Sequence, residues 1–169
     1  MNDYKMTVLV DTREKNWEHI QKYLEKAKIP YKQTKLLYGD YSLLLECKKD
    51  GFMRQYNLQT IFAIERKANL DELIQNVARK EYRRRFYEEI KRKDIYNARM
   101  DIIIEESDWY SKVVKGNYIS TTPIKAVRGY LAEVQSCKGV SLTGIEKDLV
   151  ARYIVDRLIY QAKKFIEKN

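Results

Sequence analysis

The first residues in this sequence whose types and spacing could do chemistry are a carboxylate and an ammonium group that close an apolar segment. Residues 61–67 read Ile-Phe-Ala-Ile-Glu-Arg-Lys. Successive side chains of a β-strand alternate between its two faces, so Glu65 and Lys67 share one face with Ala63, and Arg66 points to the other. The carboxylate could hold a hard cation, and the ammonium could face a phosphate or a water. Taken alone, a Glu-x-Lys pair is more often a pair of solvated charges at a strand end.

Further carboxylates stand at the ends of other expected elements: Asp11 and Glu14 after a strand at residues 6–10, Asp40 in a turn between two strands, and Asp71 at the start of a long helix. Carboxylates at the ends of adjacent strands can converge, and that edge of a sheet is where α/β proteins place sites. The implied cation is an oxygen-bound Mg²⁺ or Mn²⁺. Simpler explanations exist: Asp11 can end a strand, Asp40 can form a turn, and Asp71 can complement a helix dipole.

Composition excludes several other kinds of site. The 169 residues include one histidine and two cysteines, whereas a zinc site needs about four such ligands. His19, the one base available to a Ser-His-Asp triad, lies in a Lys- and Glu-rich helical pattern. Cys47 and Cys137 lie far apart, which predicts reduced thiols in a cytoplasmic protein. Because no apolar run approaches the roughly 20 residues of a membrane span, we expect no membrane partner.

The periodic segments predict an α/β fold in which helices cover a central mixed β-sheet. Strands are expected over residues 6–10, 31–37, 41–46, 60–65, 100–105 and 139–142, and helices over 16–28, 122–136, 145–167 and from Asn69 to at least Ile90. Residues 48–51 are expected to form a hairpin tip or a short loop. Nothing marks a second domain, so residues 1–169 are predicted to form one domain.

Seven of these positions resemble, in order and spacing, the signature of the XPF-type nuclease domain. They are Asp11 and Glu14 in Val-Asp-Thr-Arg-Glu, Asp40 after Gly39, Glu65-Arg66-Lys67, and Asp71 after three further residues. That family has the restriction-endonuclease-like PD-(D/E)xK fold. The resemblance implies that Asp40 and Glu65 bind Mg²⁺, for which Mn²⁺ can substitute, and that Lys67 orients the attacking water. It also implies that Asp11, Glu14, Arg66 and Asp71 support the site.

The resemblance implies a metal-dependent DNA endonuclease that hydrolyses phosphodiester bonds without a small-molecule cofactor. Its partner would be DNA, and because members of the family commonly dimerise, a homodimer is also implied. Two departures leave open a selectivity for branched, flap or junction DNA. Asn76 stands where larger members have serine, and residues 120–169 show no helix-hairpin-helix domain. The sequence around Arg85-Phe86 and Glu89 is more similar to small stand-alone bacterial or phage versions.

Basic residues concentrate in the second half of the long helix. The chain has 33 Lys and Arg against 24 Asp and Glu, a formal charge of +9, which favours a polyanionic partner. Residues 79–93 alone hold eight basic and three acidic residues. Arg79 and Arg83 lie four residues apart, and with Arg85 they could guide a phosphate backbone toward the metal. A solvated helix face, with these arginines paired to glutamates, explains the same pattern.

Two other functions stay open from the sequence. A catalytically inactive DNA-binding module of the same fold would keep the basic helix, although every expected acid is present. An RNA-associated basic protein without an active site would explain the charge, but not Asp40, Glu65 and Lys67 together. Plasmid nicking that requires Mg²⁺ and stops with EDTA would favour the endonuclease.

Overall fold

The computed structural model describes residues 4–168 and is organised around one mixed sheet of seven strands. The strands are β1 (Tyr4–Asp11), β2 (Tyr31–Thr34), β3 (Tyr41–Lys49), β4 (Phe52–Asn57), β5 (Phe62–Lys67), β6 (Arg99–Ile104) and β7 (Val140–Gly144). Their order is β2-β1-β3-β5-β6-β7, with β4 paired to the outer part of β3. Strand β3 is antiparallel to β1, β4 and β5, whereas the β1–β2, β5–β6 and β6–β7 pairs are parallel. The predicted mixed α/β sheet is confirmed.

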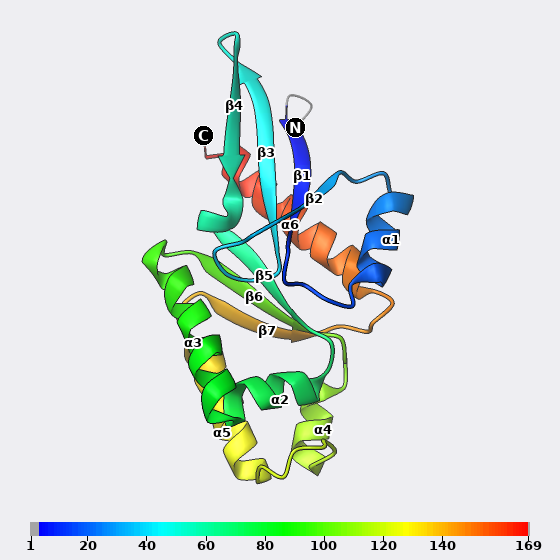
Figure 1. Ribbon diagram of the computed structural model, residues 1–169, viewed down its shortest axis with the longest axis vertical. Coiled ribbons are helices and arrows are strands. Elements are labelled where there is room, and N and C mark those ends of the chain that lie inside the picture. The colour runs from blue at the N-terminus through cyan, green and yellow to red at the C-terminus, as the bar shows by residue number, and fades with distance from the viewer. Residues whose placement is uncertain (1–3, 169) are drawn as a thin grey trace.

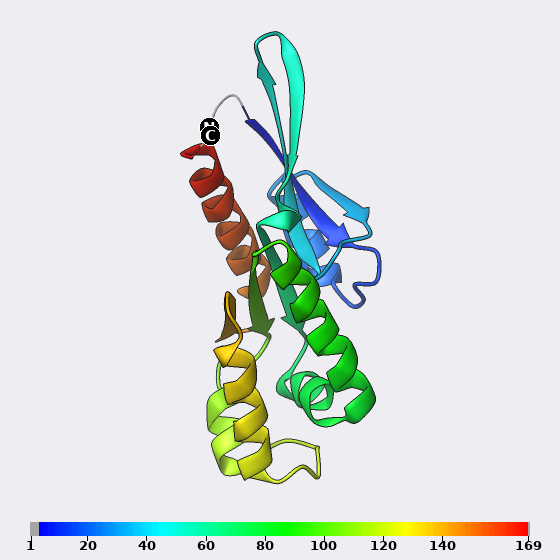
Figure 2. The same cartoon turned by 90° about the vertical axis from the view of Figure 1, so that its left-hand side faces the viewer.

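Helices cover both faces of the sheet, as Figures 1 and 2 show. They are α1 (Glu18–Lys26), α2 (Leu70–Ala78), α3 (Lys80–Ile95), α4 (Trp109–Lys115), α5 (Ile124–Ser136) and α6 (Val150–Ile166), and a 3₁₀ turn, η1, spans Leu58–Thr60. Helices α1 and α6 share one core with Phe62 and Ile64 of β5. Helices α2 to α5 share the other core with Ala63, on the opposite face of the same strand. Among the described residues, no helix is long and apolar enough to cross a membrane.

The structure differs from the predicted elements in three places. The long helix expected from Asn69 is broken at Arg79, whose extended backbone (φ −84°, ψ 125°) separates α2 from α3. The break lets two differently directed helices bury side chains in one core, among them Ile74 of α2 and Phe86 of α3. Strand β4 was not predicted because most of its side chains are exposed, so it lacks an alternating pattern. The short helix α4 was also missed.

Strands β3 and β4 form a hairpin that extends beyond the rest of the sheet (Figures 1 and 2). Its turn is the pair Asp50-Gly51, at the predicted hairpin tip, and both residues have positive φ, 53° and 81°. This is the two-residue geometry that Asp-Gly favours, because its twist matches that of the flanking strands.

Candidate active site

The turn before β3 fixes Asp40 between two strands. The amide of Asp40 donates to the carbonyl of Ile64 at 2.7 Å, and its carbonyl accepts from the amide of Asp11 at 2.8 Å. Its carboxylate accepts from the backbone amide of Arg66 at 2.7 Å. Gly39 makes this approach possible, because its φ is 69° and a Cβ there would lie 3.0 Å from the carbonyl oxygen of Ile64. The Gly-Asp pair therefore carries an acidic side chain to the edge of β5.

Glu65 and Lys67 lie on one face of β5, as strand alternation predicts. Both are buried, and the Nζ of Lys67 is 2.6 Å from Oε1 of Glu65. The same ammonium is 3.7 Å from the carboxylate of Glu72 and 5.6 Å from the ring centre of Phe86. Burial alone would lower the pKa of Lys67, but the carboxylates of Glu65, Asp40 and Glu72 outweigh it and raise the pKa. Lys67 is thus a fixed, buried cation.

Carboxylates crowd this edge of the sheet. Burial, followed by the charges of Glu65 and Glu14, raises the pKa of Asp40 well above its ordinary value. Burial and the charge of Glu65 likewise raise the pKa of Glu89, on α3, to about 7. The protein therefore holds more negative charge here than Lys67 alone compensates, and a bound cation would relieve it.

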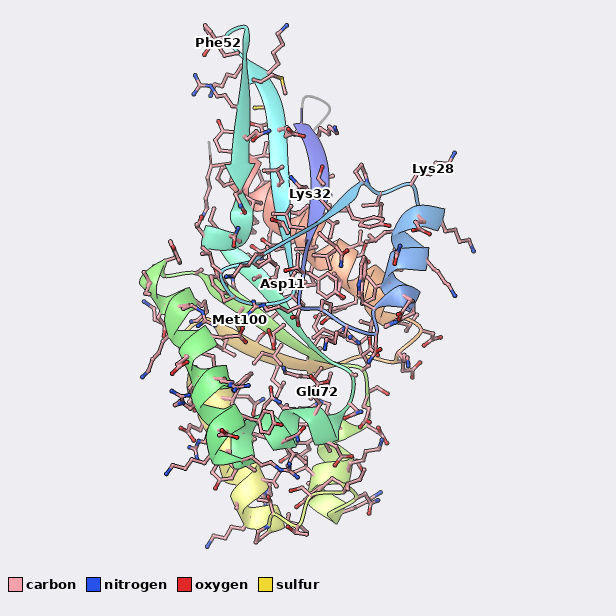
Figure 3. All side chains as sticks on the ribbon, viewed as in Figure 1. Asp11, Lys28, Lys32, Phe52, Glu72 and Met100 are labelled. Atoms are coloured by element: carbon pink, nitrogen blue, oxygen red, sulfur yellow. The ribbon has the colours of Figure 1, made fainter. Side chains whose placement is uncertain are left out.

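An open cavity of about 300 Å³ lies in front of Glu65 and Lys67. It is lined by these two residues and by Arg13, Asn76, Tyr82, Arg85, Phe86, Glu88, Glu89 and Arg92. Figure 3 shows the side chains of this region, with Asp11 at the end of β1 and Glu72 at the start of α2. The cavity combines the acid edge of β5 with three arginines, so an anionic group could enter beside the carboxylates.

Arg66 points to the opposite face of β5 and joins a buried ion network. Its guanidinium donates to Glu14, to Glu105 at 3.0 Å and to the carbonyl of Lys15 at 2.8 Å. His19 lies 2.6 Å from the same Oε1 of Glu105, and Oε2 of Glu105 is buried without a hydrogen-bond partner. The sequence did not predict a role for Glu105, which is the partner of both Arg66 and His19. The available signal was the position of Glu105, directly after the apolar strand β6.

Asp11 and Asp71 are bound to other parts of the chain. The carboxylate of Asp11 accepts from the amide of Leu36 and from Arg13, each at 2.7 Å. Burial alone would raise the pKa of Asp11, but these hydrogen bonds outweigh it and lower the pKa. Asp71 accepts from the amide of Ile119 at 2.7 Å. Asp11 therefore shapes the loop that precedes Asp40, and Asp71 anchors the loop after α4. In place of Asp71, the next residue of α2, Glu72, reaches Lys67.

The three arginines expected to contact DNA lie in different surroundings. Arg85 lines the cavity with Glu65. Arg79 stands at the helix break, beside a separate groove formed by α2 and residues 119–122. Arg83 forms a 2.7 Å ion pair with Glu133 of α5, and its guanidinium lies 4.6 Å from the ring centre of Tyr130. The helix break precedes this pair: Arg79 caps α3 and its carbonyl accepts from the amide of Arg83 at 2.8 Å, but the two side chains have different neighbours.

The acid edge fits a hard divalent cation. Within residues 4–168, no three His, Cys, Asp or Glu side chains are grouped so that they could enclose a metal ion. Mg²⁺ is usually held by one or two carboxylates, with waters and substrate phosphates completing its octahedral shell. Asp40 and Glu65 would be such a pair, and burial, followed by the charges of Glu65 and Glu14, raises the pKa of Asp40.

Comparison with known families gives a match to the ERCC4 domain over residues 10–156. The chain belongs to the ERCC4 domain family. The structure of this ERCC4 domain is similar to XPF from Aeropyrum pernix, with a TM-score of 0.57 and 18% sequence identity, covering 90% of this chain and 65% of that chain. The same protein in complex with DNA gives a TM-score of 0.57 at 18% identity, covering 94% and 66%. No curated protein matches the sequence.

The ERCC4 assignment confirms the resemblance to XPF-type nuclease domains inferred from the motif residues. The structural match confirms the fold class, a mixed sheet flanked by helices. This ERCC4 domain spans slightly less than two thirds of the XPF chains it matches. Similarity to small bacterial or phage versions stays a prediction.

Proposed function

We propose that this ERCC4 domain is a metal-dependent DNA endonuclease that hydrolyses phosphodiester bonds at the edge of β5. The observation that carries the proposal is the meeting of Asp40, Glu65 and Lys67 at one edge of the sheet, beside an open cavity lined by arginines. Asp40 and Glu65 would hold Mg²⁺, and Mn²⁺ would substitute because it also prefers oxygen ligands.

The residues of this edge divide the work of hydrolysis. When bound, the cation supplies charge stabilisation at the phosphate and a lowered pKa for the attacking water. Lys67, held charged by its carboxylate neighbours, donates hydrogen bonds to that water or to a phosphate oxygen. Arg85 and Arg92 at the cavity would bind the flanking phosphates.

The supporting residues act through position. Arg66 connects β5 to Glu14 and Glu105, so it holds the strand that bears Glu65 and Lys67. Asp11 fixes the loop that leads to Asp40. Asp71 would support the site indirectly, by fixing the start of α2 against the loop at Ile119.

DNA is the proposed substrate and partner. One of the similar structures is XPF from Aeropyrum pernix in complex with DNA, and the charge of +9 favours a polyanion. Formation of a homodimer is a further part of this proposal that rests on the sequence resemblance, and location in the cytoplasm is one that rests on the separated cysteines. Selectivity for branched DNA is left to the assay below.

A cleavage assay over single-stranded, duplex, flap, splayed-arm and four-way-junction DNA tests the proposed function. We expect cleavage of at least one substrate with Mg²⁺ or Mn²⁺ and none with EDTA. Binding of all substrates without cleavage in either metal would instead favour the inactive DNA-binding module. Comparison of cleavage rates among the substrates then gives the preferred DNA structure.

A further inference from the structure

The tip of the β3–β4 hairpin exposes apolar and basic side chains together. Phe52 and Met53 are 72% and 67% exposed. Exposed cationic side chains flank them: Lys48, Lys49 and Arg54. Asp50 is the one acidic residue of segment 48–54, and it lies 3.7 Å from Arg54. The tip is therefore net basic, and its large apolar side chains do not contribute to either core.

The hairpin holds this tip in a defined position. Lys49 pairs with Phe52, and Lys48 pairs with Met53, across the two-residue turn. At the base of the hairpin the ring of Tyr56 packs on Phe165 of α6, with ring centres 5.1 Å apart. A short turn with matched twist and an anchored base loses little conformational entropy when it binds a ligand.

Part of the tip shares a sheet face with the candidate active site. Tyr41 of β3 pairs with Ile64 of β5, and both side chains enter the core under α1 and α6. Alternation then places Lys48, with its cross-strand neighbour Met53, on the face that carries Glu65 and Lys67, and it places Lys49, Phe52 and Arg54 on the opposite face. In Figure 1, helices α2, α4 and α5 lie at the far end of the molecule from the hairpin. Tyr38 belongs to the core on this face and is hydrogen-bonded to Gln59 of η1, so a long ligand at the active site would pass over these residues to reach the tip.

The length of β3 sets the distance between the hairpin tip and Asp40. Asp40 immediately precedes β3, and the tip begins where this nine-residue strand ends. At about 3.4 Å per residue the strand spans about 27 Å. Duplex DNA rises about 3.4 Å per base pair, so the tip lies about eight base pairs from the acid edge.

We propose that the hairpin tip, residues 48–54, is a second DNA-binding element that contacts duplex about eight base pairs from the cleaved phosphate. Lys48 on one face of the hairpin and Lys49 and Arg54 on the other bind backbone phosphates, while Met53 and Phe52, one on each face, pack against the sugars. The inference deepens the proposed function, since it names duplex beyond the active site as part of the substrate. Charge complementarity, and the position of Lys48 and Met53 on the face of the active site, favour DNA over a membrane surface as the occupant.

Binding to duplexes of graded length tests this element. The triple variant Lys48→Gln/Lys49→Gln/Arg54→Gln is compared with wild type by fluorescence anisotropy, with Ca²⁺ in place of Mg²⁺, on duplexes of about 6 to 20 base pairs that bracket the estimated reach. The control Lys22→Gln/Lys26→Gln/Lys28→Gln removes the same charge from exposed positions on or next to α1. Single Lys48→Gln repeats the test if the triple variant lowers the melting temperature.

The triple variant should lose about tenfold in affinity on the longest duplex and less than about twofold on the shortest. The slope of the logarithm of its binding constant against the logarithm of salt concentration should fall in magnitude by about two to three. Phe52→Ser/Met53→Ser should weaken binding to long duplex without changing the slope. The control should lose less at every length. The proposal would be overturned if the triple variant lost affinity equally on short and long duplex, or if the control lost as much as the triple variant. It would also be overturned if the tip substitutions weakened binding to anionic vesicles and left DNA affinity unchanged.

These outcomes are independent of catalysis. If wild type binds with the expected dependence on length but never cleaves, the endonuclease proposal fails and the hairpin inference stands. If wild type cleaves in Mg²⁺ and the tip triple behaves like wild type on every duplex, the hairpin inference fails and the endonuclease stands.

Discussion

The carboxylate of Asp40 accepts a 2.7 Å hydrogen bond from the backbone amide of Arg66, the residue that follows Glu65. This contact joins an acid from the turn before β3 to the edge of β5, and it places two carboxylates next to each other. The hydrogen bond does not compensate the repulsion, because burial and the charges of Glu65 and Glu14 still raise the pKa of Asp40. Folding therefore assembles a group of like charges, an arrangement that is typical of functional sites.

Removing the charge of Asp40 should stabilise the metal-free protein. A carboxyl group whose pKa is raised on folding contributes stability below its unfolded pKa and loses that contribution as the pH rises through the folded value. In EDTA, Asp40→Asn should therefore melt several degrees above wild type at pH 8, where about 1 kcal/mol corresponds to 2–4 °C, and close to wild type at pH 4. Thermal unfolding at both pH values measures the difference. A variant that is less stable at pH 8 would contradict the crowded-acid interpretation.

Glu89 should contribute to the pH dependence of stability near neutrality. Its folded pKa is about 7, raised from 4.5 chiefly by burial and then by the charge of Glu65. Between pH 4.5 and 7 the folded state holds this proton more tightly, so stability falls across that window by up to about 3 kcal/mol. In EDTA, the free energy of unfolding of Glu89→Gln should therefore fall less between pH 4.5 and 7 than that of wild type. Glu88→Gln, on the next residue, serves as the control and should leave the decline in place.

Glycine should be required at position 39 because the backbone of Ile64 lies close to it, as well as because its φ is positive. Gly39 and Gly51 both have positive φ. A Cβ at Gly39 would contact the backbone of Ile64, whereas a Cβ at Gly51 would have no non-neighbouring atom within 4 Å. Gly51→Ala should cost about 1–2 kcal/mol from its left-handed conformation. Gly39→Ala should cost about 2 kcal/mol more and should also abolish cleavage, since it displaces Asp40. Chemical unfolding of the two variants measures the difference, and equal costs would show that the close approach is unimportant.

Arg85 and Arg83 should separate DNA binding from helix packing. Arg85 lines the cavity, so Arg85→Gln should reduce the log–log salt slope of DNA binding by about 0.9 with little change in melting temperature. Arg83→Gln removes the contacts with Glu133 and Tyr130, so it should lower the melting temperature and leave the slope unchanged. Anisotropy titrations in Ca²⁺ at several KCl concentrations measure both slopes. If Arg83→Gln changed the slope and Arg85→Gln did not, Arg83 and not Arg85 would be the residue that contacts DNA.

Local periodicity was sufficient to predict the orientation of the β5 side chains. Alternation alone placed Glu65 and Lys67 on one face and Arg66 on the other, and the structure has this arrangement. The predicted helix start at Asn69 was equally local, because the side chain of Asn69 accepts from the amide of Glu72 at 2.9 Å. Such features depend on neighbours a few residues away, so a single sequence contains them.

The remaining features depend on which elements become neighbours. Glu105 meets Arg66 because β6 lies parallel to β5, and that pairing has no local signature. The helix break at Arg79 occurs without glycine or proline, so packing of α2 and α3 on one core decides it. The partner of Arg83, Glu133, lies 50 residues away along the chain, so that contact has no local signature either.

The most direct measurement of the central claim is the single-turnover rate of DNA cleavage by wild type and by Glu65→Gln in Mg²⁺. This substitution removes a charged ligand and nearly preserves shape, so the variant should fold and bind DNA as wild type does. Wild type should cleave, cleavage should stop with EDTA, and the variant should be slower by more than about 100-fold. Cleavage by Glu65→Gln at the wild-type rate, or wild-type cleavage that persists in EDTA, would contradict the assignment of a metal-dependent site at Asp40, Glu65 and Lys67.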